Sequence, residues 1–134
     1  MKKKTKPDEV APTCSIDYAF RRIGSKYKGR ILMYLYQQEI MRYGVLRRHM
    51  SDITPKMLTQ TLKELEEDDL IHREAFKEIP PRVEYSLTHM GHQLIPFIIL
   101  LRDWGKEKME IRGMIPIPPK DCIPPKESAL ALVM

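Results

Sequence analysis

The stretch TPKMLTQTLKELEEDD, residues 54–69, decides the fold. Thr54 has the side chain of a helix N-cap, and Pro55 suits the first helical position because its ring presets the backbone. Three leucines recur at helical spacing on one face: Leu58, Leu62 and Leu65. This stripe predicts a helix that packs on a core along one side only. The helix should end near Asp69, where the chain must enter the left-handed region that Asp tolerates better than most residues.

Three shorter helices are expected upstream of this stretch. The first covers 15–23, with Ser15 as its N-cap and an apolar face. The second begins at about residue 28. The third covers 43–50, and its buried side chains should be Val45, Leu46 and Met50. Together with the helix of residues 54–69, the third forms a helix-turn-helix.

Two strand-like runs and a long helix are expected downstream. The runs cover 71–77 and 83–87, and apolar and polar residues alternate in the second. Thr88 then caps a helix that reaches about residue 112. Helices, a β-hairpin and a further helix predict a mainly α protein with a small β-hairpin wing (α+β). This is a winged helix-turn-helix with an added C-terminal dimerisation helix, 88–112.

Length and composition limit what the chain can be. Its 134 residues suit one domain, and its net charge of +5 is compatible with a polyanionic partner. The longest apolar run, 94–101, is far shorter than the roughly 20 residues of a membrane span, and no apolar segment follows the basic start. The two cysteines lack metal-ligand spacing. We therefore expect a cytoplasmic protein with no cofactor, no metal and no membrane partner.

Composition divides the chain into three parts. Residues 1–13 are basic and polar and should form a flexible arm, and residues 14–112 carry the winged helix-turn-helix domain. Residues 113–134 form a proline-rich tail in which Pro-Pro-Lys occurs twice, and we expect it to be extended or disordered. Its apolar last residues, 129–134, could dock on a partner subunit.

The polar side of the helix-turn-helix is cationic. From Arg42 to Lys63 there are five basic residues and one acid, whereas the next six residues, 64–69, include five acids. Because phosphate repels acids, the second helix should enter a DNA groove with its N-terminus first, where the helix dipole also favours phosphate. From this region we expect the following DNA contacts: Arg42, Arg47, Arg48, Thr54, Pro55, Lys56, Thr59, Gln60 and Lys63.

These side chains suggest different kinds of contact. Gln60 could pair with adenine and Lys56 with guanine or phosphate, whereas the three arginines suit backbone phosphates. The wing adds Lys77 and Arg82 beside a tip stiffened by two prolines, which suits minor-groove or phosphate contact. Glu84 should orient Arg82 or pair internally.

Several stretches together resemble the HxlR-type family of bacterial and archaeal transcription factors, which is MarR-like. They are IGSKYK (23–28), RY (42–43), KMLTQ (56–60), LEED (65–68), IHRE (71–74), PPRVEYSLT (80–88) and WG (104–105). The resemblance covers about two thirds of the chain. It implies a homodimer that binds double-stranded DNA at a pseudo-palindromic operator. It also implies that the first and last helices form the dimer contacts. Asp69, where the family often has Gly, and the proline-rich tail depart from the family pattern.

The last helix is apolar on more sides than one core contact needs. With the first helix, it gives the side chains that we expect at the dimer interface: Ile16, Phe20, Leu94, Phe97, Ile98, Leu101 and Trp104. The alternative is that the last helix only covers the core of its own domain.

Cys14 is a candidate for regulated chemistry. It precedes the first helix, whose N-terminal amides should lower the pKa of its thiol. The resemblance implies a thiol-based redox or electrophile sensor at this position, and Cys122 in the tail could serve as a resolving partner. The alternative is an unreactive thiol at the interface.

Two other function classes have less support in the sequence. No phosphate-binding loop, metal motif or nucleophile–base pattern is present, so we do not expect an enzyme. A winged helix that binds proteins instead of DNA would carry an apolar recognition face, against which Lys56, Gln60, Lys63 and Arg82 argue. An oxidant or small-molecule effector is compatible with the sequence but not identified by it.

Overall fold

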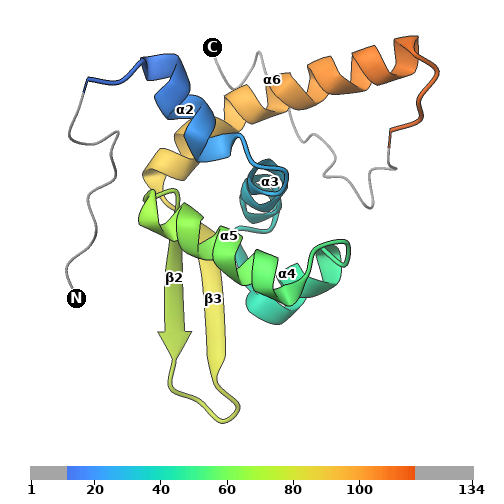
Figure 1. The fold of residues 1–134 in the computed structure, drawn as a ribbon. Helices are drawn as coiled ribbons and strands as arrows, with labels where there is room; N and C mark the ends of the chain where they lie inside the picture. Colours follow the sequence, from blue (N-terminus) through green and yellow to red (C-terminus); the bar gives the residue numbers. More distant parts are fainter. Residues whose placement is uncertain (1–11, 117–134) are drawn as a thin grey trace.

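The computed structural model describes residues 12–116 (Figure 1). Its helices are α2 (Ser15–Ile23), α3 (Lys28–Gln38), α4 (Tyr43–His49), α5 (Pro55–Glu67) and α6 (His89–Ile111). Its strands are β1 (Ile40–Arg42), β2 (Ile71–Phe76) and β3 (Arg82–Leu87). The fold is the expected winged helix-turn-helix: α4 and α5 form the helix-turn-helix, and β2 and β3 form the wing. The predictions for the proline-rich tail, Cys122 and most of the basic arm concern residues outside the described range.

The core lies where α3, α4, α5 and α6 meet. Figure 1 shows α3 end-on in the middle, with α6 on one side and α5 on the other. The largest fully buried side chains are Ile31, Leu32, Leu35, Leu46, Met50, Leu58, Leu62, Leu65, Ile95 and Ile99. All three leucines predicted to face inward from α5 are in this set. Truncating one such leucine to alanine removes about 2–5 kcal/mol of stability, so this core fixes how α5 is presented.

Both ends of α5 follow from its sequence. The Thr54 hydroxyl accepts a hydrogen bond from the amide of Met57 at 3.1 Å, and Pro55 is the first helical residue. After the helix, Asp69 has a φ of 59°, the left-handed conformation predicted for it. The predicted start and end of the helix are therefore confirmed.

The sheet has one strand more than the sequence analysis predicted. Its order is β1-β3-β2, and β1 pairs antiparallel with β3 so that Met41 lies opposite Tyr85. Both of these side chains are buried. Strand β1 escaped prediction because three residues are too few to show an alternating pattern. The added strand anchors the base of the wing to the segment that leads into α4.

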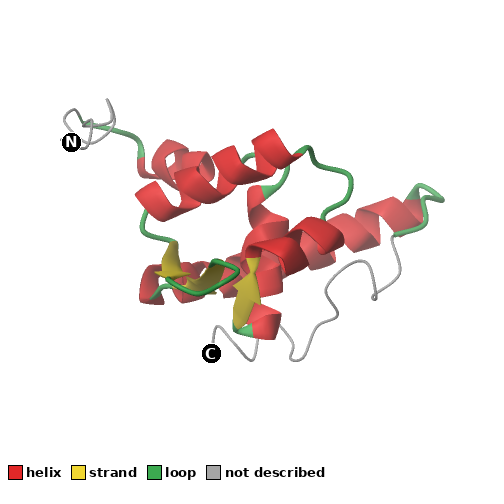
Figure 2. Ribbon diagram, turned by 90° about the horizontal axis from the view of Figure 1, so that it is seen from below, coloured by secondary structure: helices red, strands yellow, loops and turns green. Residues whose placement is uncertain are grey.

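The start of α6 is tied to the end of α5. The Thr88 hydroxyl accepts a hydrogen bond from the Gly91 amide at 3.1 Å, which confirms the predicted cap, and donates one to the Asp69 carbonyl. A Cβ on Gly91 would collide with the carbonyl oxygen of Leu70, so only glycine allows this approach. Helix α6 then continues through Pro96 and extends beyond the helical body (Figure 2).

Two local predictions were wrong. Ser15 is the first residue of α2, and its N-cap is Cys14, which has extended backbone angles. Val45 is half-buried instead of buried, and it packs against the core beside the fully buried Leu46 and Met50. In both cases the error is small because the helices themselves are where the sequence places them.

Candidate DNA-binding face and apolar groove

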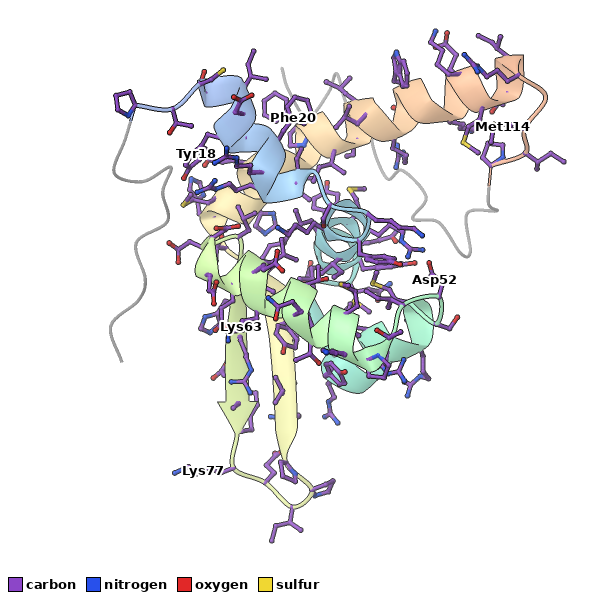
Figure 3. The ribbon with its side chains drawn as sticks, viewed as in Figure 1. Tyr18, Phe20, Asp52, Lys63, Lys77 and Met114 are labelled. Atoms are coloured by element: carbon purple, nitrogen blue, oxygen red, sulfur yellow. The ribbon has the colours of Figure 1, made fainter. Side chains whose placement is uncertain are left out.

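The outer face of α5 carries polar and cationic side chains. Lys56, Thr59, Gln60 and Lys63 are all exposed, whereas Leu58, Leu62 and Leu65 are buried. Figure 3 shows Lys63 on this outer face. Gln60 Nε2 donates a hydrogen bond to Glu64 Oε2 at 3.2 Å, so its amide is already oriented along the helix. This face has the side chains that hydrogen-bond to bases and phosphates in a major groove.

Helix α4 supports this face through a residue that sequence reasoning missed. Tyr43 Oη and Thr59 Oγ1 are hydrogen-bonded at 3.3 Å, which links the first residue of α4 to the exposed side of α5. Tyr43 is uncharged and lies at the start of a helix, so the sequence gives no sign of this role. Only the folded structure shows that its hydroxyl lies next to Thr59 of α5. Arg48 is exposed on α4, whereas Arg47 is half-buried.

Three acids around α5, namely Asp52, Glu64 and Asp68, form internal ion pairs. Asp52, in the turn before α5, pairs with Arg30 through both carboxylate oxygens, at 2.8 and 3.0 Å, and this hydrogen bonding lowers the pKa of the Asp52 carboxyl. At the far end of α5, Glu64 lies 3.2 Å from Lys28 Nζ, and Asp68 lies 3.9 Å from Arg22 Nε. The side chains of Arg22 and Asp68 are only 8% and 6% exposed. The acidic end of α5 is thereby fastened to α2 and α3, away from its cationic N-terminal end.

Cations without an ion-pair partner remain on the exposed side. On α4, α5 and the wing loop, the exposed cations that have no ion-pair partner within residues 12–116 are Arg48, Lys56, Lys63 and Lys77. Lys77 lies on the wing, and Lys63 lies on α5 above it (Figure 3). Arg42 is also exposed, but its Nε lies 4.0 Å from Glu84. Wing and helix-turn-helix therefore present cations along one side of the molecule.

The predicted role of Glu84 is confirmed, because its carboxylate pairs with Arg82. Arg82 Nε is buried and lies 3.4 Å from both Glu84 Oε2 and Glu78 Oε2, without a hydrogen bond to either. Its guanidinium also stacks 3.9 Å from the centre of the Phe76 ring. The guanidinium of Arg82 is thus engaged in contacts within the wing.

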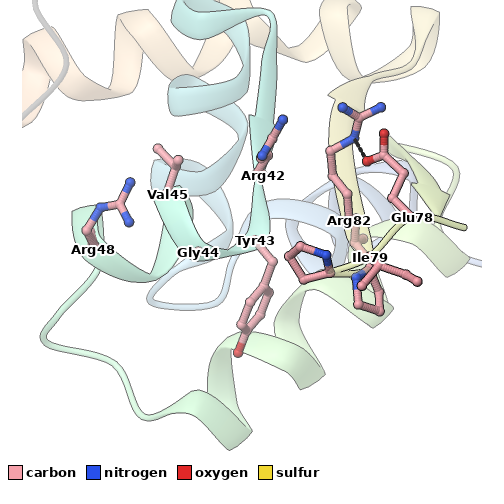
Figure 4. Close-up of a pocket in the computed structure, with 11 residues that line it drawn as sticks. Arg42, Tyr43, Gly44, Val45, Arg48, Glu78, Ile79 and Arg82 are labelled. Carbon is pink, nitrogen blue, oxygen red and sulfur yellow. Dashed lines mark ion pairs between the residues drawn. The ribbon is translucent and has the colours of Figure 1, made fainter. Parts of the chain in front are cut away.

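A groove of about 950 Å³ separates the wing tip from α4 (Figure 4). One wall carries Arg42, Tyr43 and Arg48, and the other carries the loop from Glu78 to Pro81. The groove opens beside the exposed face of α5. Its size and its cationic wall suit one strand of a polyanion.

A second groove, about 720 Å³ and almost wholly apolar, lies between α2 and α6. Phe20, Phe97, Leu101 and Trp104 line it and are 51–63% exposed, and Phe20 lies in the angle between the two helices (Figure 3). Leu94 is half-buried at the groove, and Ile16 is exposed on α2. Ile98 must be removed from the predicted interface set, because it is 8% exposed and belongs to the protomer's own core.

Cys14 stands at the open N-terminus of α2. It is exposed, and the backbone amides of Asp17 first and of Ile16 next lower the pKa of its thiol. More of the thiol is therefore ionised near neutral pH than in an ordinary cysteine, and the thiolate is the reactive form.

Two further classes of site were sought in residues 12–116. No three His, Cys, Asp or Glu side chains gather there in a way that could hold a metal ion. None of the helices there is long and apolar enough to cross a membrane.

Comparison with known proteins agrees with this geometry. The HxlR-like helix-turn-helix family model matches residues 22–112. The HTH-type transcriptional regulator YdeP of Bacillus subtilis, itself uncharacterized, is 43% identical over 94 residues, covering 70% of this chain and 73% of YdeP. The redox regulator HypR in its reduced form superposes with a TM-score of 0.70 at 34% identity, covering 75% of this chain and 98% of HypR. HypR in its oxidized form superposes with a TM-score of 0.64 at 40% identity, covering 70% of this chain and 96% of HypR.

Proposed function

The chain belongs to the HxlR-like helix-turn-helix family, whose members are transcriptional regulators and not enzymes, and we propose that it binds a pseudo-palindromic DNA operator as a homodimer. One observation carries the DNA-binding part. The exposed face of α5 and its surroundings present cations without ion-pair partners among the described residues, whereas Glu64 and Asp68 at the far end of α5 pair with α3 and α2. Such a helix enters the major groove with its N-terminal half, and the wing reaches the flanking backbone.

The homodimer follows from the apolar groove between α2 and α6. Its large exposed side chains would leave a monomer with a contiguous apolar patch of the kind that marks an interaction surface. A second copy that presents the same two helices covers it, because a two-fold interface pairs one patch with itself. The same symmetry places two recognition helices on one operator, which explains why the operator should be pseudo-palindromic.

Cys14 supports a second candidate function, thiol-based sensing. It is exposed, its thiol pKa is lowered, and the fold is similar to that of the redox regulator HypR. An oxidant such as diamide would accept two electrons and two protons from the Cys14 thiols of two subunits, which become a disulfide. Because Cys14 immediately precedes α2, this bond would change how the subunits and their recognition helices are oriented.

DNA binding is tested by selection from a random duplex library with the purified full chain. The selected duplex is then compared with a scrambled duplex by fluorescence anisotropy. We expect tight, salt-dependent binding to the selected duplex only. Enrichment of no sequence would overturn the proposal and favour a winged helix that binds proteins.

Oligomeric state and thiol sensing need separate measurements. Light scattering after size-exclusion chromatography should give twice the mass of one chain. Diamide should release the wild-type protein from the selected duplex but leave the Cys14→Ser variant bound. An equal response of both proteins would reject Cys14 as the sensor without affecting the DNA-binding proposal.

A further inference from the structure

The tip of the wing is apolar and fully exposed. Ile79 is 102% exposed, and Pro80 and Pro81, which follow it, are exposed as well. Isolated exposed apolar residues are common on proteins, so exposure alone assigns no role. What distinguishes Ile79 is its position, at the outermost point of a supported hairpin and on the wall of the cationic groove opposite α4.

Arg82 holds this tip in place. Its guanidinium stacks on Phe76 of β2, and its Nε lies 3.4 Å from Glu78 in the loop and from Glu84 in β3. These contacts connect the two strands and the loop that joins them, so that the loop has a defined position relative to β3. Arg82 is also only 25% exposed as a side chain.

The same contacts neutralise the charge of Arg82. Glu78 and Glu84 together carry two negative charges, and Arg42, the other cation near Glu84, lies 4.0 Å from it. Two arginines and two carboxylates therefore balance at the base of the tip. From the sequence we expected Arg82 to contact DNA, but in the structure its charge is already compensated. In the wing loop, Lys77 is exposed and has no ion-pair partner among the described residues.

The groove beside the tip indicates what Ile79 would meet. It is about 950 Å³ in volume, and Arg48 lies on the wall opposite Ile79 and the two prolines. If α5 occupies a major groove, this space would receive the phosphate strand that borders it, and the wing tip would reach the adjacent minor groove. A minor groove accepts apolar side chains because its walls are formed by deoxyribose carbons and hydrogens.

This inference rests on the proposed DNA binding, in which the wing lies at the flanking minor groove. We infer that Ile79 makes an apolar contact there and that Arg82 positions Ile79 instead of binding phosphate. Ile79 packs against the sugar walls, flanked by the rigid Pro80. The contact is apolar, so it adds affinity without releasing counterions. At the tip of the wing, the ionic contribution comes from Lys77.

The test uses the full chain on its selected duplex. Ile79→Ser should weaken binding about thirtyfold, because a dimer loses two apolar contacts worth roughly 1 kcal/mol each. The slope of log K against log salt should stay unchanged, whereas Lys77→Gln should reduce it by about 2 for the dimer. Met90→Ser, which changes an exposed apolar residue of α6 outside the proposed contact faces, serves as the matched control and should bind like wild type.

Arg82 is tested by a double-mutant cycle. If it acts by positioning Ile79, Arg82→Gln should weaken binding strongly in the wild-type background but at most about twofold in the Ile79→Ser background. If it contacts phosphate directly, its effect should add to that of Ile79→Ser, and the salt slope should fall by about 2. Additivity with a reduced slope would overturn the positioning role.

Hydroxyl-radical footprinting locates the contact. Wild type should protect the sugars of the minor groove that flanks each half-site, and Ile79→Ser should lose this protection while major-groove protection remains. Unchanged affinity and footprint for Ile79→Ser would overturn this inference alone, provided that wild type prefers the selected duplex. Failure of wild type to discriminate between duplexes would overturn the proposed function, and this inference with it.

Discussion

The salt dependence of operator binding is the most quantitative consequence of the cationic face. On α4, the outer face of α5 and the wing loop, four exposed cations per protomer lack ion-pair partners among the described residues, which gives eight in a dimer: Arg48, Lys56, Lys63 and Lys77. If each meets one phosphate, log K should fall against log salt with a slope of about −7. Raising KCl from about 50 to about 200 mM should then weaken binding about 10⁴-fold.

Counting every basic residue singled out from the sequence gives a different number. Adding Arg42, Arg47 and Arg82 makes fourteen cations per dimer, for which the slope would be about −13. The structure favours the smaller value because Arg42 and Arg82 are ion-paired and Arg47 is half-buried. The measured slope of log K against log salt therefore distinguishes two sets of phosphate contacts: the seven cations named from the sequence and the four of them that are exposed without an ion-pair partner among the described residues.

The assay is fluorescence anisotropy of the selected duplex at five KCl concentrations. Lys63→Gln should bring the slope to about −5, since a dimer loses two contacts. Lys106→Gln, on the exposed side of α6, is the control and should leave the slope unchanged. Selective binding with a slope near −2 would refute the assignment of phosphate contacts, and a slope near −13 would show that the ion-paired arginines are released on binding.

Three further predictions concern stability, assembly and the thiol. Asp69→Gly should stabilise the fold by about 1 kcal/mol, because glycine adopts a φ of 59° without strain, and an unchanged or lower urea midpoint would contradict this. Phe97→Glu should convert the dimer into monomers in light scattering, since it places a charge in the apolar groove; a persistent dimer would locate the interface elsewhere. In a Cys122→Ser background, the iodoacetamide alkylation of Cys14 should reach half its maximal rate at a lower pH than that of a cysteine in a short peptide, because its thiol pKa is lowered. Half-maximal alkylation at the peptide's pH or above would argue against activation by the α2 amides.

Local signals determined which elements could be predicted from the sequence. The ends of α5 are encoded by single residues, a Thr-Pro start and an Asp that accepts a positive φ, and they were predicted correctly. Strand β1 carries no such signal, because its three residues gain their conformation from pairing with β3.

The functional side chains were harder to predict than the helices that carry them. A sequence shows that Arg82 is basic, but whether its charge is available depends on Glu78, Glu84 and Phe76 around it. Similarly, α6 is apolar on several sides, and only its packing on α3 reveals that Ile98 faces inward. Whether a side chain is free to bind a partner therefore depends on the residues that surround it in the folded protein.

The ion pairs at the far end of α5 connect the orientation of this helix to that of α2. The thirteen residues of α5 span about 20 Å, and the contact between Asp68 and Arg22 of α2 is the point about which α2 and α5 would turn relative to each other. Because the buried leucines bind α5 to the core, α5 and its domain would turn together relative to α2. A rotation of about 10° at that point carries Lys56 through about 3 Å, the length of a hydrogen bond, and Thr59 through about 2 Å. A small reorientation of α2 is thus magnified into loss of register with the bases, while the core of the domain stays packed.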